Sequence, residues 1–211
     1  MEPRPLSLDR ADATRERILD AAEALLRRHG LAKTTVVDVA RALAMSHANV
    51  YRHFTSKAAL QDAVAERWLH RVSAPLAEVV ARDEPASARL EAWVLALVSV
   101  KRRKVLDDPE LFATYQAVAQ GAREVVRDHV ATLRAQVEAI VRDGVARNEF
   151  AIPAADAPAA AEAVLDATAR FHHPHHVRDA AARLEADEMR AARRVVALLT
   201  AGLRAGALPG E

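Results

Sequence analysis

The segment from Thr35 to Phe54 contains two short helical patterns separated by a break of about three residues. The hydroxyl of Thr35 is followed three residues later by the carboxylate of Asp38, which is the capping signature of a helix N-terminus. Ser46 is placed to cap a second helix that begins at His47. The positions expected to face inward are Val36, Val39, Ala40, Leu43, Val50 and Phe54. Two short helices joined in this way predict a helix-turn-helix.

The composition favours helices along the rest of the chain as well. Among 211 residues only 6 are glycine and 9 are proline, whereas 51% are hydrophobic, so a turn-rich β fold is disfavoured and a core can form. We therefore expect an all-α fold of about nine helices, with an N-terminal three-helix helix-turn-helix domain and a C-terminal helical ligand-binding and dimerisation domain. The expected helices cover about 14–29, 35–43, 47–54, 56–82, 85–106, 109–120, 122–147, 159–170 and 177–206.

The expected domain organisation follows from these patterns. Residues 1–12 form a disordered leader, residues 13–58 the helix-turn-helix domain, residues 59–205 the second domain and residues 206–211 a tail. Gly30 is placed to end the first helix in a left-handed conformation, and Pro75 is expected to kink or break the fourth.

Positive charge is concentrated around the predicted helix pair. The whole chain has a formal net charge of +1, whereas the stretch from Arg27 to Lys57 has six basic residues and one acid, a local charge of +5. The basic residues are Arg27, Arg28, Lys33, Arg41, Arg52 and Lys57, with His29, His47 and His53 beside them. Such a concentration is typical of a phosphate-binding surface, and a merely solvated basic face is the alternative.

Several classes of protein are disfavoured by what the sequence lacks. The absence of cysteine excludes disulfides, thiolate metal sites and cysteine nucleophiles. No nucleophile and base stand in a recognisable catalytic arrangement, so we do not expect an enzyme. No apolar run approaches the roughly 20 residues of a membrane span, and the first 18 residues contain no signal-peptide core, so we expect a cytoplasmic protein without a membrane partner.

The strings "RERILDAAEALL" and "TTVVDVARALAMSHANVYRHFTSKAAL" resemble the DNA-binding domain of the tetracycline-repressor (TetR) family of bacterial regulators. The resemblance is close over about residues 14–62, including the spaced string Tyr51, His53, Phe54 and Lys57, and elsewhere extends only to the helical layout. The chain has Ala44 and Ala48 where the family usually or often has glycine. A left-handed Ala44 costs on the order of 1 kcal/mol, which surrounding packing can absorb.

The resemblance implies how this segment contacts DNA. Tyr51, His53 and Lys57 are implied to grip backbone phosphates, and Thr35 is implied to add a contact from the start of its helix. Base reading is then expected from His47, Asn49 and Arg52, because asparagine pairs with adenine and arginine with guanine. For Tyr51, a half-buried packing role is the alternative. The complete set of expected DNA-binding residues is Thr35, Ser46, His47, Asn49, Tyr51, Arg52, His53 and Lys57.

The second domain offers two candidate effector sites. Apolar and aromatic residues are expected either to line a ligand pocket or to form ordinary core; they are Trp93, Leu97, Phe112, Tyr115 and Phe171. The "FHHPHH" segment suggests, as an alternative, a zinc, nickel or haem site at His172, His173, His175 and His176. We favour a helix-connecting loop with Phe171 in the core and no cofactor. The basic run from Lys101 to Lys104 is expected to be a solvated helix cap rather than a second DNA or ligand-anion contact.

Together these features predict a homodimeric repressor that a small, mainly apolar effector releases from a palindromic double-stranded DNA operator. The last two helices, from about Ala159 and about Val177, are expected to form a four-helix bundle with those of a second copy. The stripe that needs this cover is Val195, Leu198, Leu199 and Leu203. A metal- or haem-sensing repressor that uses the His172–His176 segment remains the alternative.

Overall fold

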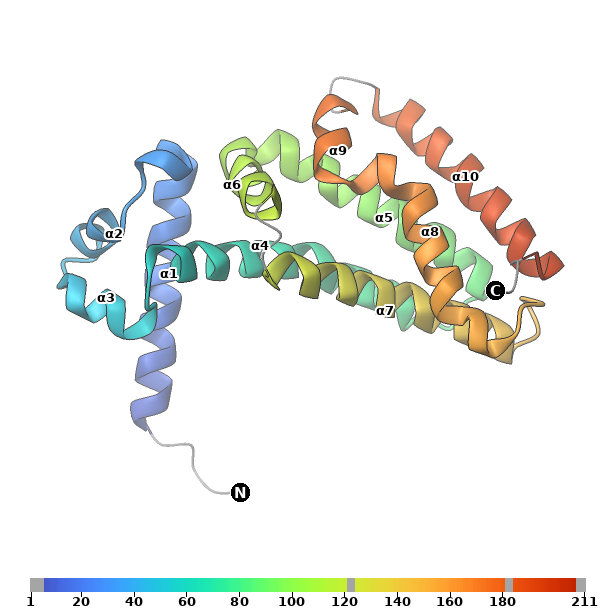
Figure 1. Cartoon of the computed structure of the whole chain (residues 1–211), viewed down its shortest axis with the longest axis horizontal. Helices are drawn as coiled ribbons and strands as arrows, with labels where there is room; N and C mark the ends of the chain where they lie inside the picture. The colour runs from blue at the N-terminus through green and yellow to red at the C-terminus, as the bar shows by residue number, and fades with distance from the viewer. Residues whose placement is uncertain (1–5, 121–123, 181–183, 208–211) are drawn as a thin grey trace. The chain divides into compact units, whose positions relative to one another are not determined.

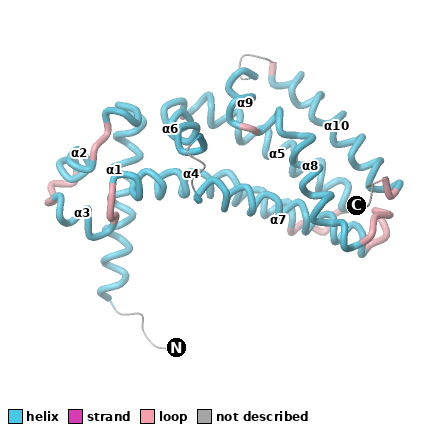
Figure 2. The backbone as a smooth tube through the Cα atoms, in the orientation of Figure 1, coloured by secondary structure: helices cyan, strands magenta, loops and turns pink. Residues whose placement is uncertain are grey.

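The computed structural model describes residues 6–120, 124–180 and 184–207, and every regular element in these ranges is helical (Figure 2). The all-α prediction is therefore confirmed. The helices, which Figure 1 labels, are α1 (Leu6–Lys33), α2 (Val36–Ala42), α3 (His47–His53), α4 (Lys57–Val80), α5 (Ala86–Asp107), α6 (Pro109–Gln120), α7 (Glu124–Ala146), α8 (Ala157–His172), α9 (Pro174–Ala180) and α10 (Glu185–Ala205), with a 3-10 turn at Ala154–Asp156. None of the described helices is long and apolar enough to cross a membrane.

The chain divides into two compact units. The first unit consists of Met1–Trp68 and Asp108–Val125, and the second of Leu69–Asp107 and Val126–Glu211. The expected boundary lies between residues 58 and 59. The division in the structure instead falls within α4, after Trp68, and the first unit also includes α6.

Long-range contacts explain why α6 belongs to the first unit. The Arg27 guanidinium on α1 binds Asp108, just before α6, with an Nε–Oδ1 distance of 2.8 Å. Within α6, Tyr115 and Phe112 pack against Trp68 of α4, with ring centroids 4.9 and 6.1 Å away. These residues are distant in sequence, so a reading based on local patterns separates them.

The first helix begins earlier than expected and bends near its end. It starts at Leu6 rather than Thr14, because no proline or glycine interrupts the chain between Leu6 and Gly30. Residues 1–5 of the expected leader lie outside the described residues. At Gly30, φ is 73° as expected for a glycine stop, but ψ is 172°, so the residue is not in the left-handed helical region. The backbone kinks there and a short helical end follows to Lys33.

Two further helix predictions need correction. α4 continues through Pro75 without a break. The single long helix expected from Val177 is instead divided into α9 and α10, and residues 181–183 between them lie outside the described residues. Of the expected tail, Gly206 is the left-handed cap of α10, with φ 68° and ψ 27°.

The second unit is closely packed where α5 begins and α7 ends. The Glu149 carboxylate accepts hydrogen bonds from the backbone N–H groups of Ala86 and Ser87, at 2.9 and 3.3 Å, and so caps α5 from a distant segment. Gly144 on α7 lies against the Phe150 ring, and a Cβ added there would come 2.8 Å from the Ala86 Cβ. The second unit thus depends on a glycine at this helix contact.

We expect Gly144→Ala to lower the free energy of unfolding by about 1–3 kcal/mol, because the added methyl overpacks the Phe150 and Ala86 contact. Urea unfolding followed by circular dichroism measures the change. The matched control is Gly202→Ala, inside α10, where an added Cβ meets nothing within 4 Å. The control should raise the free energy of unfolding by about 0.5–1 kcal/mol, because alanine has a higher helix propensity than glycine. Equal effects of the two substitutions would contradict this account of the packing.

Candidate functional site

The helix pair α2 and α3 begins with the capping box that the sequence predicts. The backbone N–H of Asp38 donates to Thr35 Oγ1 at 3.2 Å, and the backbone N–H of Thr35 donates to Asp38 Oδ2 at 3.1 Å. The Thr35 hydroxyl also donates to Asp38 Oδ2 at 2.6 Å. Hydrogen bonds from the side chain and backbone of Thr35 lower the pKa of Asp38. The capping prediction is confirmed, and the cap fixes the Thr35 side chain on the surface.

The turn between the two helices has the geometry that glycine would favour. Ala44 has a φ of 51°, so alanine occupies a left-handed position here. Ser46 then caps α3, because its Oγ accepts a hydrogen bond from the backbone N–H of Asn49 at 3.3 Å. Both features follow the sequence prediction and set the angle at which α3 leaves the turn.

α3 has one buried and one exposed face. Val50 and Phe54 are buried, which confirms their assignment to the core. The exposed positions are His47, Ala48, Tyr51 and Arg52. Tyr51 is 48% exposed, so about half of its surface is covered, and the phosphate contact and the half-buried packing role both stay predictions. His53 is half-buried at the end of the helix.

Asn49 does not belong to the exposed face. Its side chain is half-buried, with Nδ2 3.7 Å from the Met45 Sδ, and its buried Oδ1 has no hydrogen-bond partner among the described residues. Asn49 must therefore change rotamer before it can reach a base. Ala48, by contrast, lies on the exposed face, three and four residues before Tyr51 and Arg52, a spacing that would have revealed it from the sequence.

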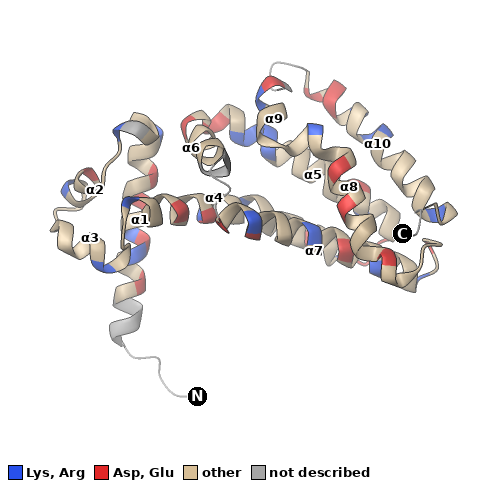
Figure 3. Cartoon of the chain, viewed as in Figure 1, with Lys and Arg blue, Asp and Glu red and all other residues tan. Residues whose placement is uncertain are grey.

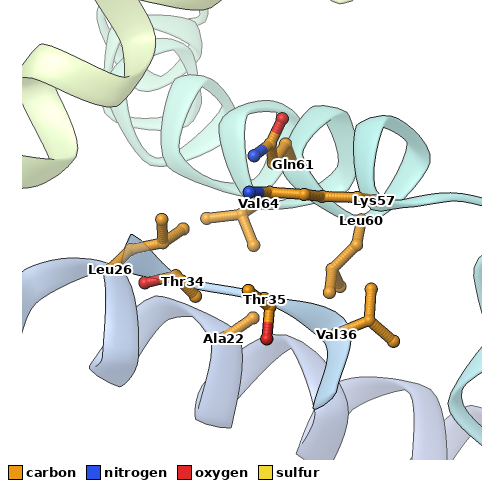
Figure 4. A pocket seen from close by; sticks show the side chains of 9 residues that line it. All are labelled: Ala22, Leu26, Thr34, Thr35, Val36, Lys57, Leu60, Gln61 and Val64. Carbon is orange, nitrogen blue, oxygen red and sulfur yellow. The ribbon is translucent and has the colours of Figure 1, made fainter. Parts of the chain in front are cut away.

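Two of the expected phosphate-contacting residues, Thr35 and Lys57, line the same small crevice (Figure 4). Lys57 and Gln61 extend from α4, and Thr34 and Thr35 lie on the opposite wall, in the segment that enters α2. The crevice has a volume of only about 10 Å³, so it has no room for an organic ligand. Its importance is that it brings Thr35 and Lys57 to one place on the surface.

Figure 3 marks the basic and acidic residues of the described chain. Ion pairs neutralise part of the positive charge that the sequence count assigns to the helix pair. Arg27 binds Glu23 and Asp108, at 2.7 and 2.8 Å, and both acids lie outside the counted stretch. Arg41 is 3.3 Å from Asp38. The other basic side chains of the stretch are exposed: Arg28, Lys33, Arg52 and Lys57. A surface hollow of about 420 Å³ is lined by Leu25, His29, Lys33, Asp38, Arg41 and Ala42.

The five residues expected to line an effector pocket are divided between the two units. Phe112 and Tyr115 belong to the first unit, where they pack against Trp68. The other three are buried in the second unit: Trp93, Leu97 and Phe171. The Trp93 indole N–H donates to Gln136 Oε1 at 2.9 Å, which fixes the ring against α7. Within the first unit, Phe112 and Tyr115 thus act as core residues.

Three of the four neighbouring histidines lie near one another, because the ring centroids of His175 and His176 are 5.5 and 5.6 Å from that of His173. His172 ends α8, where its Nε2 lies 3.2 Å from the Leu165 carbonyl oxygen, and Phe171 is buried as expected. His173 adopts an extended conformation, and its ring stacks on His175 with centroids 5.5 Å apart. His175 and His176 belong to α9, so the segment is not simply a loop. The described residues contain no group of three or more potential ligands able to hold a metal ion, which gives the metal-sensing alternative no support.

Lys101 is not part of a solvated cap, contrary to expectation. It is only 2% exposed, because it lies on the buried face of α5 and not at the solvated end of the helix. Its Nζ lies 3.4 Å from the Nε2 of the buried His129 on α7. The sequence contains the signal for this position, since Lys101 follows Trp93 and Leu97 at intervals of four residues. His129 lies four residues before the buried Leu133 in the same way, and sequence reasoning missed it.

Burial and mutual repulsion shift the pKa values of these basic groups. Burial lowers the pKa of Lys101 to about 7. Burial, with added repulsion from Lys101 and His172, lowers the pKa of His129 to about 2. Burial and Lys101 likewise lower the pKa of His172 to about 4, although its bond to the Leu165 carbonyl acts in the opposite direction. Lys101, His129 and His172 therefore form one interacting cluster, which we call the basic cluster.

Two stretches of the chain match known families. Residues 18–64 match the family described as "Bacterial regulatory proteins, tetR family", and residues 86–196, more than half of the chain, match the "Tetracyclin repressor-like, C-terminal domain". The chain belongs to the tetR family. Proteins of this family are DNA-binding regulators rather than enzymes. The first match includes α2 and α3, and the second includes all three residues of the basic cluster.

Individual relatives are similar over parts of the sequence. The chain is 32% identical over 110 residues to the HTH-type transcriptional regulator Rv1255c of Mycobacterium tuberculosis H37Rv. These 110 residues are 52% of this chain and 52% of Rv1255c. It is 35% identical over 80 residues to the HTH-type transcriptional repressor KstR2 of Rhodococcus jostii RHA1, which is 38% of this chain and 39% of KstR2. The chain thus spans about half the length, or less, of these curated relatives.

The fold itself is shared over nearly the whole chain. A putative TetR-family regulator from Mesorhizobium loti has a TM-score of 0.69 at 19% identity, covering 91% of this chain and 97% of the other. FadR from Bacillus subtilis, solved in complex with stearoyl-CoA, has a TM-score of 0.63 at 15% identity, and the match covers 89% of this chain and 98% of FadR. At these identities the likeness concerns the fold alone.

We expect the stability of this TetR protein to rise with pH between about 7 and 10.5, because the unfolded state binds more protons there than the folded state with its depressed Lys101 pKa. Lys101→Met should remove this dependence and, at pH 7, raise Tm by at least about 2–4 °C, which corresponds to about 1 kcal/mol for a chain of this size. Thermal unfolding between pH 7 and 9.5 measures both effects. Arg103→Met, an exposed position on the same helix, should behave like the wild type; an unchanged pH dependence in Lys101→Met would refute the assignment.

Proposed function

We propose that this chain is a homodimeric transcriptional repressor that a small effector releases from a palindromic DNA operator. The observation that carries the proposal is the capped helix pair of a TetR protein, in which α3 buries Val50 and Phe54 and exposes His47, Tyr51 and Arg52. A helix with this division can enter the major groove of DNA with its exposed face towards the bases. That KstR2 is named a repressor and Rv1255c a transcriptional regulator supports this choice.

The proposed division of labour within the interface follows from position. Thr35 and Lys57, at the starts of α2 and α4, contact phosphates, as do Tyr51 and His53 near the end of α3. Arg52 and His47 face the base edges from the exposed side of α3. The Ala48 methyl group is placed to contact a thymine methyl, and Asn49 contributes only after its side chain rotates outward.

The proposed dimer forms through α8 and α10. Leu198 on α10 is 75% exposed, which is unusual for a leucine in a helix that otherwise buries Val196 and Leu203. Neighbouring α8 exposes small residues, including Ala163 and Ala167, which allow a second helix to approach closely. Of the stripe predicted from the sequence, Leu203 is covered within the chain and Leu198 is the residue that most needs a partner.

The proposed switch requires no metal or haem. An effector bound in the second unit would favour a dimer whose two recognition helices no longer match the half-site spacing, and a coupling of about 1–3 kcal/mol is typical of such switches. The proposed place of action is the cytoplasm, where the operator DNA is located.

The phosphate and base contacts can be distinguished by mutation. Lys57→Ala should weaken binding to operator and random DNA alike and reduce the slope of log affinity against log salt by about one unit. Arg52→Ala should instead cost about 1–3 kcal/mol on the operator, with little effect on random DNA. Fluorescence anisotropy on the DNA flanking the gene gives both values. Arg103→Ala, on α5, removes the same charge and should change neither the DNA affinity nor its salt dependence. If Lys57→Ala and Arg52→Ala both bind DNA like the wild type, the interface lies elsewhere.

The dimer interface has a matched pair of leucines for its test. Leu198→Glu should split the protein into folded monomers that lose operator affinity, because one subunit covers only one half-site. Leu184→Glu alters an equally exposed residue, at 73%, just before α10, and should remain dimeric. Analytical ultracentrifugation distinguishes the two outcomes. A dimeric Leu198→Glu protein would place the interface on another surface.

A further inference from the structure

We propose that two copies of this chain recognise each other through opposite charges, with Arg194 of each subunit forming ion pairs with Glu162 and Asp166 of the partner subunit. The inference rests on the proposed dimer surface of α8 and α10. It adds which helices face each other across that surface and which side chains select a second copy of this chain as the partner.

Two acidic residues lie on the exposed face of α8 without a partner in their own chain. Glu162 and Asp166 are both exposed and four residues apart, so they share one side of the helix, where Figure 3 shows acidic positions in red. Neither forms a hydrogen bond or an ion pair with the described residues. Like charges at this spacing repel each other, so a cation held beside both of them is stabilising.

α10 carries one arginine that is available to pair with these acids. Arg194 is exposed and forms no hydrogen bond or ion pair within the part of the chain that the structure describes. It lies four residues before the exposed Leu198 and therefore on the same face of the helix. The other arginines of α10 all have partners in their own chain: Arg190 with Asp187, Arg193 with Glu91 of α5, and Arg204 with Ser87 of α5.

α8 and α10 pack against each other and run in opposite directions. At one end of the pair, Arg170 near the end of α8 forms an ion pair with Glu188 near the start of α10, at 3.5 Å. At the other end, the backbone N–H of Ala151, before α8, donates to the carbonyl oxygen of Leu203 on α10 at 2.9 Å. The two helices therefore form one layer, and their exposed positions are available to a second copy.

This antiparallel arrangement brings the unpaired charges to the same level of the layer. Counted from the ion pair of Arg170 and Glu188, Asp166 and Glu162 are four and eight residues back along α8, whereas Arg194 is six residues forward along α10. Because both helices rise equally per residue, Arg194 lies between the levels of the two acids.

Two-fold symmetry limits how two such layers can pair. Each contact of a symmetric dimer occurs twice, so α8 faces either the α8 or the α10 of the second copy. If α8 faced α8, the acidic pair would meet Glu162 and Asp166 of the partner subunit, and like charges facing each other across an interface are unfavourable. If α8 faces α10, Arg194 meets opposite charge, and symmetry repeats this favourable contact. The charges therefore select the second arrangement.

The apolar part of the surface is compatible with this pairing. Leu198 is 75% exposed, and an exposed alanine directly follows each acid of α8. When Leu198 packs onto these alanines in the second copy, Arg194 is about 6 Å further along α10. A long arginine side chain reaches one of the acids from there.

A charge exchange between the two helices tests the pairing. One variant is Arg194→Glu, and the other combines Glu162→Arg with Asp166→Arg. Each homodimer then places like charges together, so its dissociation constant should rise at least about tenfold over the wild type. Sedimentation velocity over a concentration series measures the constant. All three positions are exposed, and circular dichroism checks that both variants keep the helix content of the wild type.

Combining the two variants should restore the dimer, because opposite charges then meet at both contacts. When they are coexpressed with a size tag on one chain, native mass spectrometry should find more heterodimer than the random pairing of tagged and untagged wild-type chains gives. A single chain that carries all three substitutions should likewise return to the homodimer affinity of the wild type. The control is Arg193→Glu, which makes the same charge change at the neighbouring residue that faces α5, and it should dimerise like the wild type.

Several results would overturn the proposal. Wild-type dimerisation of Arg194→Glu would do so, as would random pairing of the coexpressed variants. A tighter homodimer of the variant with Glu162→Arg and Asp166→Arg would also do so, because it would show α8 facing α8. Leu198→Glu separates these results from the proposed function. If it is monomeric while the charge variants dimerise normally, the dimer surface is retained and the ion pairs are rejected; if it is dimeric, the surface itself is rejected.

Discussion

A buried carboxylate shared by two arginines holds the first unit together. Glu23 on α1 is almost completely buried. Its carboxylate oxygens form ion pairs with a guanidinium nitrogen of Arg67 on α4, at 2.5 Å, and with one of Arg27, at 2.7 Å. Arg67 also reaches Asp20, and Arg27 reaches Asp108 before α6. Breaking a buried ion pair by removing one partner typically costs about 3–5 kcal/mol, so each of these residues constrains the others. Because only three residues separate the end of α3 from the start of α4, this network also fixes where the DNA-binding helices are anchored.

Local features of the interface were predictable because their causes lie within a few residues. The Thr35 and Asp38 capping box, the Ser46 cap and the positive φ of Ala44 each depend on hydrogen bonds or sterics between near neighbours. The buried and exposed sides of α3 follow from its helical period, with Asn49 as the exception. Its inward rotamer depends on Met45 and on the packing of the turn, which periodicity does not describe.

Features that depend on contacts between residues far apart in the chain could not be predicted from local sequence patterns. The neutralisation of Arg27 by Asp108 joins positions 81 residues apart, so a local charge count overstated the basic surface. The basic run predicts that Lys101 lies in solvent, whereas its spacing from Trp93 and Leu97 places it on the buried face of α5. The break after α8 agrees with the expected end of that helix and also has a local cause, because the residue before a proline disfavours helical geometry and His173 precedes Pro174.

The inward rotamer of Asn49 has a consequence for how α3 can read a base. Its carbonyl oxygen is buried without a hydrogen-bond partner among the described residues, so the folded-back state carries a desolvation penalty of about 1–3 kcal/mol. Outward rotation gives this carbonyl a partner either in water or, at an adenine in the right register, through the base contact of the whole amide. The penalty is relieved in both cases, so it lowers the cost of rotation equally for every sequence, and any preference for one base comes from the base contact alone.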